Sequence, residues 1–198
     1  MKKLTLSLAT VLTLTSGAFA SSVNENTSDW MEPAGYVGIG YTRISGDIDV
    51  SVFGFGSESA SISGNAVTLN AGFNFNPYIA VEARYTRAID ETSLDTDFGT
   101  LYSNDRISNF GAYVKPQYKT GTGTLYALLG YGRVDVENTG ENEFQWGIGA
   151  SYEYESNFSI FFDYMRISDS SETLYTPYGA VSVNTTLDTY TFGLSYRF

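Results

Sequence analysis

The end of the chain alternates strictly between bulky apolar and small polar residues. From Thr189 to Phe198, aromatic residues and Leu occupy every second position, and Thr, Gly, Ser and Arg197 occupy the positions between them. Successive side chains of a β-strand point to opposite faces, so the pattern predicts a strand with one apolar and one polar face. At about 2.5 Å of height per tilted residue, this run covers the ~25 Å apolar band of a transmembrane barrel. We therefore expect lipid on the apolar face, with Asp188 just outside the bilayer.

The same alternation recurs in seven earlier segments, where aliphatic or aromatic residues alternate with Gly, Ser, Thr, Asn or charged residues. Short turns alternate with long connections between the segments, which is typical of a transmembrane barrel with short periplasmic turns and long outer loops. We predict an all-β fold, an eight-stranded antiparallel up-and-down transmembrane β-barrel. The expected strands span 37–42, 67–75, 79–86, 109–117, 125–132, 145–154, 159–165 and 189–198. The long connections lie near 45–65, 88–106, 135–143 and 168–187.

The N-terminus has the pattern of a cleaved export signal. Lys2 and Lys3 precede an apolar stretch, and a small-x-small cleavage motif follows at 18–20. The apolar stretch is too short to serve as a membrane-spanning anchor, which is the alternative interpretation. The expected division of the chain is a signal peptide at 1–20, a periplasmic N-terminal extension at 21–34 and the barrel at 35–198.

Composition narrows the class of protein further. Aromatic residues make up 16% of the chain, whereas the hydrophobic share is only 42%, because a spanning strand has a single apolar face. No later stretch approaches the ~18 consecutive apolar residues of a transmembrane helix. Removing the signal peptide takes away two of eleven basic residues and none of twenty-two acidic ones, so the net charge changes from −11 to −13. Nucleic acid is therefore not an expected partner.

The main structural alternative is a secreted barrel that holds a small ligand. Such a barrel points its apolar residues inward and its polar residues outward. Here the polar face consists of Gly, Ser, Thr, Asn and charged residues, which do not form a dry pocket. The sequence favours the transmembrane barrel.

The chain contains neither histidine nor cysteine. Histidine is the usual general base of hydrolytic chemistry and the partner of a catalytic serine. We therefore expect no enzymatic activity, cofactor or metal site. Acid-only catalysis by loop carboxylates stays open as an alternative.

Tyr-x-Arg recurs at the outer ends of the four predicted strands that run outward. Tyrosine is favoured at membrane interfaces, and guanidinium groups bind phosphate bidentately. We expect an outer aromatic girdle capped by arginines that contact lipopolysaccharide phosphates. The alternative is that any charge is tolerated just above the membrane. The residues are Tyr41 and Arg43, Tyr85 and Arg87, Tyr131 and Arg133, and Tyr164 and Arg166.

Six charged residues fall in the inward phase of the predicted strands, toward the periplasmic end. Eight strands leave an interior just wide enough for side chains to fill, so we expect these charges to pair with one another and with Tyr113, Tyr126 and Gln117. We therefore expect the charged side chains to close the interior as a polar plug. The alternative is that they form a gate or a proton path. The six residues are Glu82, Arg84, Lys115, Glu153, Asp163 and Arg197.

The long connections are strongly acidic, with Arg106 as their only basic residue. Solvated, mutually repelling loops are expected, and bridging by a divalent cation is the alternative. Hydrophobic residues beside these charges, among them Phe53, Phe55, Tyr175 and Tyr178, suggest that the strands continue above the bilayer as a rim that could bind a partner. Loose extensions of the barrel without a partner are the alternative. The acidic residues are Asp47, Asp49, Glu58, Asp90, Glu91, Asp95, Asp97, Asp105, Asp135, Glu137, Glu141, Glu143, Asp169 and Glu172.

Over its whole mature length the chain resembles the small outer membrane β-barrel domain family, which includes the OmpA-type transmembrane domain, OmpX-like proteins and opacity-type surface antigens. The resemblance implies a location in the bacterial outer membrane, among lipids and lipopolysaccharide. It also implies that Tyr196 and Phe198 form the signal read by the barrel assembly machinery. The segments that carry the resemblance are 35–38, 81–85, 129–132 and 196–198.

Together these features predict a monomeric outer membrane barrel with a structural or surface-interaction role. Its long acidic loops would contact a host or other cell-surface partner, in the manner of an adhesin. A narrow porin-like channel for small solutes or ions is the alternative function.

Overall fold

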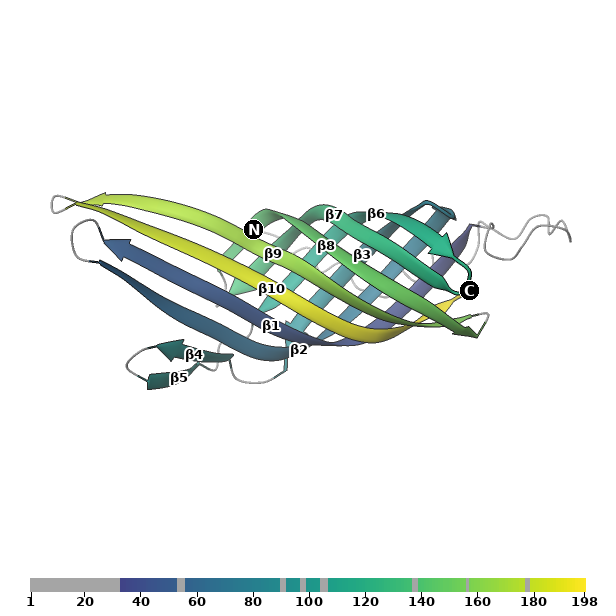
Figure 1. The fold of residues 1–198 in the computed structure, drawn as a ribbon, viewed down its shortest axis with the longest axis horizontal. Coiled ribbons are helices and arrows are strands. Elements are labelled where there is room, and N and C mark those ends of the chain that lie inside the picture. Colours follow the sequence, from purple (N-terminus) through teal and green to yellow (C-terminus); the bar gives the residue numbers. More distant parts are fainter. Residues whose placement is uncertain are drawn as a thin grey trace, which may run out of the picture.

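The computed structural model describes residues 33–52, 56–89, 92–96, 99–103, 107–136, 139–155, 157–176 and 179–198. These residues form ten strands, and eight of them wrap into one closed barrel (Figure 1). The predicted signal peptide and nearly all of the predicted extension at 21–34 lie outside the described residues. The strands are β1 Ala34–Val52, β2 Gly56–Asn76, β3 Ile79–Ala88, β4 Thr92–Thr96, β5 Gly99–Ser103, β6 Ser108–Thr120, β7 Gly123–Val136, β8 Thr139–Glu155, β9 Phe158–Thr176 and β10 Gly179–Arg197.

Every barrel strand pairs antiparallel with its neighbours in the chain, in the order β1, β2, β3, β6, β7, β8, β9, β10. The barrel closes because β1 also pairs with β10, from Tyr36 opposite Arg197 to Val52 opposite Val181. The predicted eight-stranded up-and-down barrel is therefore confirmed. Among the described residues there is no helix with the length and hydropathy needed to cross a membrane.

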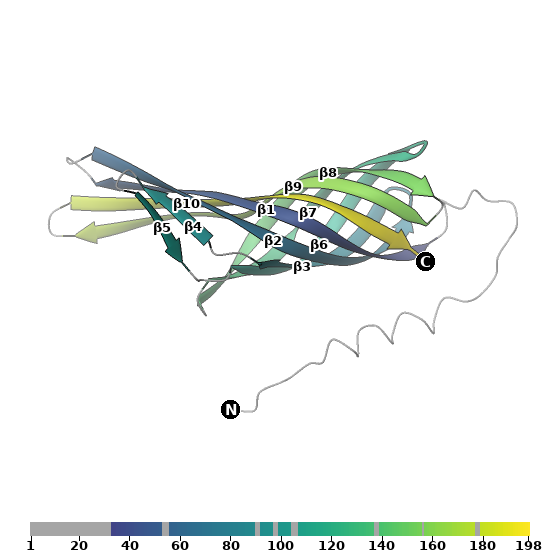
Figure 2. The same cartoon turned by 90° about the horizontal axis from the view of Figure 1, so that it is seen from below.

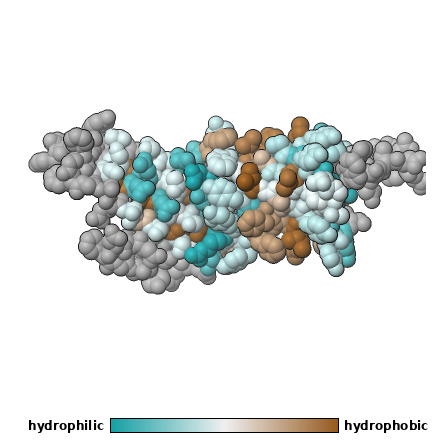
Figure 3. Space-filling view, viewed as in Figure 1, coloured by the Kyte–Doolittle hydropathy of each residue, from teal (hydrophilic) through white to brown (hydrophobic). Residues whose placement is uncertain are grey.

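The alternation of the sequence corresponds to an alternation of exposure. Along β3 every odd-numbered residue is exposed and every even-numbered residue is buried. Large hydrophobic residues such as Ile39, Phe110, Leu125 and Phe192 lie on the outer surface. Figure 3 shows hydrophobic residues gathered in a belt around one part of the molecule, with more hydrophilic residues on either side. The predicted outward direction of the apolar face is confirmed.

Four neighbouring strands continue far beyond the belt at the end opposite the short turns. The β1–β2 ladder continues to Val52 opposite Gly56, and the β9–β10 ladder to Thr176 opposite Gly179. Figures 1 and 2 show these two hairpins projecting side by side from one end of the barrel. The rim expected from the alternation in the first and fourth connections is thus present as a continuous sheet.

The connections themselves are more ordered than the sequence suggested. Within 88–106, expected to be a long connection, β4 and β5 form a hairpin, and β4 pairs with β2 through Ser61, Ile62 and Ser63. Much of 135–143 continues the β7–β8 ladder. The prediction of a loop at 88–106 was wrong because β2 has a free edge above the barrel, and β4 forms hydrogen bonds with that edge.

The interior also differs from the prediction of a purely polar plug. Aliphatic side chains fill it on the side of the projecting hairpins, including Ile44, Leu128, Ile167 and Leu187, all buried. Three of these four lie in segments that the sequence assigned to strand ends or connections. Because the strands continue there, their inward side chains are removed from water and pack against one another.

Candidate functional site

The centre of the barrel holds a buried ion-pair network. Arg84 on β3 donates hydrogen bonds from Nη1 and Nη2 to Oδ1 and Oδ2 of Asp163 on β9, at 2.9 and 2.8 Å. The same guanidinium donates through Nε to Glu82, its neighbour on the inner face of β3. The side chains of all three residues are almost completely buried. Arg84 therefore links a carboxylate of its own strand, β3, to a carboxylate of β9, a strand that is not a neighbour of β3 in the sheet.

Glu82 and Asp163 each have further donors. Glu82 accepts hydrogen bonds from the Tyr36 hydroxyl at 2.5 Å and from Lys115 Nζ at 2.9 Å. Asp163 accepts one from the Tyr126 hydroxyl at 3.0 Å. The network contains two carboxylates and two cations, so its charges balance, as buried charges require.

Glycines make room for the two tyrosine rings. A Cβ atom at Gly72 would collide with the ring of Tyr36, and one at Gly149 would collide with that of Tyr126. Each ring therefore occupies space next to a neighbouring strand that only a residue without a side chain leaves open. The inward glycines of the sequence thus position the hydroxyls that bind the carboxylates.

A layer of uncharged hydrogen bonds lies beside this network, toward the hairpin end. The Thr42 hydroxyl is 2.6 Å from that of Thr68 and 3.0 Å from that of Thr191, and Thr68 is 2.7 Å from Thr86. These four buried threonines come from four adjacent strands. On the other side of the barrel Gln145 donates to Asn109 Oδ1 at 2.9 Å and to the Ile167 carbonyl at 2.8 Å.

Three layers of side chains therefore follow one another inside the barrel: the ion pairs, the hydroxyl and amide groups, and the aliphatic cluster. Tyr36, Gln145 and the threonines were not among the predicted site residues. The signal that could have found them is their inward phase, because a polar side chain at such a position needs a partner inside the barrel.

The six predicted lumen charges separate into three groups. Glu82, Arg84, Lys115 and Asp163 share the central network. Glu153 pairs instead with Lys119, a residue the prediction missed, at 2.6 Å. Across the described part of the chain, the guanidinium of Arg197 forms no ion pair, so Glu153 and Arg197 do not join the other four charges as expected.

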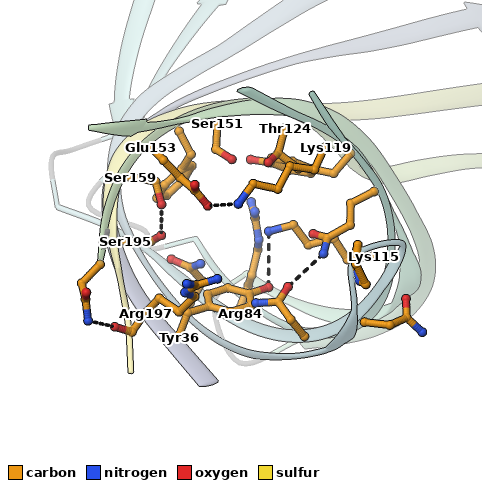
Figure 4. Close-up of a pocket in the computed structure, with 18 residues that line it drawn as sticks. Tyr36, Arg84, Lys115, Lys119, Thr124, Ser151, Glu153, Ser159, Ser195 and Arg197 are labelled. Atoms are coloured by element: carbon orange, nitrogen blue, oxygen red, sulfur yellow. Dashed lines mark hydrogen bonds and ion pairs between the residues drawn. The ribbon is translucent and has the colours of Figure 1, made fainter. Parts of the chain in front are cut away.

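Below the central network, a cavity of about 80 Å³ lies at the end of the barrel that carries the short turns (Figure 4). Asn76 and Pro77 of the β2–β3 turn and Asn157 of the β8–β9 turn line its rim. Figure 4 shows side chains of Arg84, Lys115, Lys119 and Arg197 around this space. We call it the vestibule. Its other lining residues are Tyr36, Asn70, Asn74, Gln117, Thr124, Tyr126, Ser151, Glu153, Ser159, Phe161 and Ser195.

The four predicted Tyr-x-Arg pairs all lie in the outward phase. Tyr41, Tyr85 and Tyr131 are exposed, whereas Tyr164 is half-buried between Trp146 and Tyr190, with ring centroids 5.8 and 5.3 Å away. The rings therefore face away from the interior, as an interfacial girdle requires.

The four arginines differ in their local partners. Arg166 donates two hydrogen bonds to Asp188, at 2.9 and 3.2 Å. Arg133 donates to Asp135 at 2.9 Å, and Arg43 to Asn65 at 3.1 Å. Arg87 is exposed and has no ion-pair partner within the described ranges. Its guanidinium is therefore the least engaged of the four.

The end of the chain is fixed to the first strand. The Phe198 amide donates to the Gly35 carbonyl at 2.9 Å, and the Tyr196 ring packs against that of Phe158 at 4.9 Å. Both predicted signal residues are exposed on the outer surface. Recognition by the assembly machinery stays a prediction.

The acidic connections are described only in part. Asp47 and Asp49 lie exposed on the outer face of β1, and Glu143 accepts hydrogen bonds from Ser168 and from the Asp169 amide, at 3.0 and 2.9 Å. No group of three or more acidic residues within the described ranges is arranged to hold a metal ion. Several predicted loop residues lie outside the described residues, namely Phe53, Phe55, Asp90, Glu91, Asp97, Asp105, Arg106, Glu137 and Tyr178.

Comparison with solved structures shows the same fold. The chain is similar to Ail, the attachment invasion locus protein of Yersinia pestis, solved in complex with the heparin analogue sucrose octasulfate. The identity is 16% and the TM-score 0.51, covering 85% of this chain and 100% of that one. It is also similar to the outer membrane protein OprG of Pseudomonas aeruginosa, at 12% identity and a TM-score of 0.59, covering 85% and 97%.

No curated protein matches the chain. The model of the outer membrane protein beta-barrel domain matches residues 6–198, nearly the whole sequence. The chain therefore belongs to the outer membrane protein beta-barrel domain family and is a protein of the bacterial outer membrane.

Proposed function

We propose that this protein acts at the cell surface, through the sheet that its hairpins form above the membrane, and that its barrel is a closed anchor. The observation that carries the proposal is the continuation of the β1–β10 ladder to Val52 opposite Val181. With β2 and β9 on either side, and β4 and β5 added to β2, the projecting sheet has six strands. A sheet of this size offers a broad face and edge strands to a partner.

The interior supports an anchor rather than a pore. A permeating ion would have to separate Arg84 from Asp163 and then cross the aliphatic layer around Leu128. Separating the pair would leave two uncompensated charges in the interior, which is unfavourable, so we expect the closed arrangement to dominate. The proposed function therefore needs no transport.

The charge of the projecting sheet suggests the chemistry of its partner. Ail was solved with a sulfated, strongly anionic ligand. In this chain Asp47 and Asp49 occupy the exposed face of β1, and the chain carries twice as many acidic as basic residues. Like charges repel, so a cationic surface or protein is the expected partner instead of a sulfated glycan.

Trimming the two hairpins tests this proposal. Replacing 46–62 and 171–184 by short turns leaves the barrel strands intact and should abolish adhesion to cultured cells, with the heat-modifiable gel mobility of a folded barrel retained. A matched variant, Asp47→Asn with Asp49→Asn, keeps the sheet and should weaken adhesion in a salt-dependent manner. Adhesion by the trimmed protein equal to that of the full chain would refute the surface role.

A narrow channel is the second candidate, favoured by the polar vestibule at the periplasmic end. We expect planar bilayers containing the protein to be silent. A steady current that Lys115→Ala or Glu82→Ala abolishes would establish the channel and remove the closed anchor.

The membrane-facing residues complete the proposal. Arg43, Arg87, Arg133 and Arg166 would contact lipopolysaccharide phosphates, because guanidinium groups bind phosphate bidentately. Tyr196 and Phe198 would be read by the barrel assembly machinery, and the mature protein would be a monomer. We infer no enzymatic role, since the chain has no histidine to activate a serine.

A further inference from the structure

The vestibule contains more positive than negative charge, in contrast to the rest of this acidic chain. Arg84, Lys115, Lys119 and Arg197 line it, and Glu153 is the only carboxylate among the lining residues. Glu82 and Asp163 behind them neutralise Arg84 and Lys115, and Glu153 neutralises Lys119. One positive charge, that of Arg197, is left without an acidic partner among the residues that the structure describes.

A second unpaired group lines the same cavity. Asn70 is 6% exposed, and its Oδ1 atom is the one buried side-chain oxygen or nitrogen in the described ranges without a hydrogen-bond partner. Oδ1 lies beside Gly38, in the space that a side chain at that position would fill, because an added Cβ atom there would collide with it. Leaving a buried acceptor unpaired is costly, so a donor from a ligand would be favourable here.

Hydroxyl groups occupy the wall next to this acceptor. In the register of the sheet Asn70 lies opposite Gly38, Gly38 opposite Ser195, and Ser195 opposite Ser159. The two serine Oγ atoms are 3.2 Å apart, and both point into the cavity (Figure 4). Ser151 and Thr124 add hydroxyl groups on the side of the cavity near Glu153 and Lys119, away from Arg197 (Figure 4).

We propose that the vestibule binds a hydrogenphosphate group, either as inorganic phosphate or at the end of a small phosphomonoester. Arg197 supplies the counter-charge, Ser159 and Ser195 donate to phosphate oxygens, and the phosphate P–OH donates to Asn70 Oδ1. A cavity of about 80 Å³ has room for one such anion. Sulfate has the same shape but carries no proton at neutral pH, so it leaves Asn70 unsatisfied. The site is independent of the surface role proposed above.

Calorimetric titration of the full-length protein, refolded in neutral detergent and phosphate-free buffer, tests the proposal. Inorganic phosphate should bind saturably, and sulfate at least tenfold more weakly. Arg197→Gln should weaken phosphate binding by at least tenfold, whereas Arg87→Gln, which removes the same charge from the outer surface, should leave it unchanged. Asn70→Ala should bring the affinities for phosphate and sulfate to within about twofold of each other, because the selective acceptor is gone.

Gel mobility of unboiled samples verifies that each variant is folded, and the comparison of phosphate with sulfate needs only the unmodified protein. Absence of saturable phosphate binding, equal binding of sulfate, or unchanged binding by folded Arg197→Gln would each overturn the proposal. A parallel titration with glycerol 3-phosphate tests whether the site accepts a phosphomonoester or only free inorganic phosphate. Binding like that of inorganic phosphate indicates a phosphomonoester site, and loss of binding indicates a site for the free ion.

Discussion

Arg84 and Asp163 face each other across the barrel, joined by two hydrogen bonds of 2.9 and 2.8 Å although 79 residues separate them in the sequence. They connect β3 to β9, strands that are not neighbours in the sheet. The pair therefore links opposite walls of a barrel whose size the strand ladders already determine.

Replacing Asp163 by Ala should lower the free energy of unfolding by about 3–5 kcal/mol, because Arg84 is then buried with half of its counter-charge missing. Urea unfolding of the protein in detergent micelles measures this loss. Glu153→Ala is the matched control, since its pair with Lys119 is partly exposed and should contribute less than about 1 kcal/mol. Equal losses in the two variants would contradict the central role of the buried pair.

Gly72→Ala should destabilise the protein by about 2 kcal/mol, because the new methyl group displaces the Tyr36 ring and with it the hydrogen bond to Glu82. The same unfolding assay applies. At Gly123 an added Cβ would meet only the Thr120 carbonyl, at 3.6 Å, so Gly123→Ala should be nearly neutral. A neutral Gly72→Ala would show that the ring can move without cost.

Thr68→Val should cost about 1–2 kcal/mol, because Thr68 is bonded to both Thr42 and Thr86 in the hydroxyl chain. Valine has nearly the same shape, so packing is preserved and the loss reports the hydrogen bonds. Thr120→Val, at the exposed end of β6, is the control and should change stability by less than about 0.5 kcal/mol. If the two substitutions had the same effect, the chain of hydroxyls would have no special energetic role.

The arginines of the outer girdle should differ in their effect on folding into lipopolysaccharide-containing bilayers. Replacing all four by Gln should lower folding yield there but not in neutral detergent. Among single changes, Arg87→Gln should have the largest effect, because Arg87 has no ion-pair partner among the described residues. Arg166→Gln should have the smallest, because Arg166 already pairs with Asp188. Gel-shift folding yields measure both series, and an equal loss in detergent would argue against lipid contact.

Within the predicted strands the sequence was sufficient to place side chains inside or outside, because the period of a strand is two and one face meets lipid. Val81 and Glu82 illustrate this, since one is exposed and the other buried as their alternation predicts. The pairing of Arg84 with Asp163 was not predictable in the same way. It depends on how far each strand is staggered around the barrel, which alternation does not encode.

Other differences have equally specific causes. Ile44 and Leu187 were assigned to strand ends and connections because acids and glycines interrupt the alternation near them, yet they form part of the inner aliphatic layer. Tyr36 precedes the first predicted strand by one residue. Arg197 was expected to pair like the other inner charges, but its position at the rim places it below the carboxylates that the other cations share.

The ladder that closes the barrel joins β1 to β10, the first strand of the barrel to the last. The chain therefore cannot form this seam until two strands separated by the rest of the barrel have met, which gives the fold a high contact order and predicts slow closure. Until then the edges of β1 and β10 are unpaired, and the hydrophobic outer face of the strands has no lipid around it. We therefore expect a chaperone to shield these surfaces from water until the barrel closes in the bilayer.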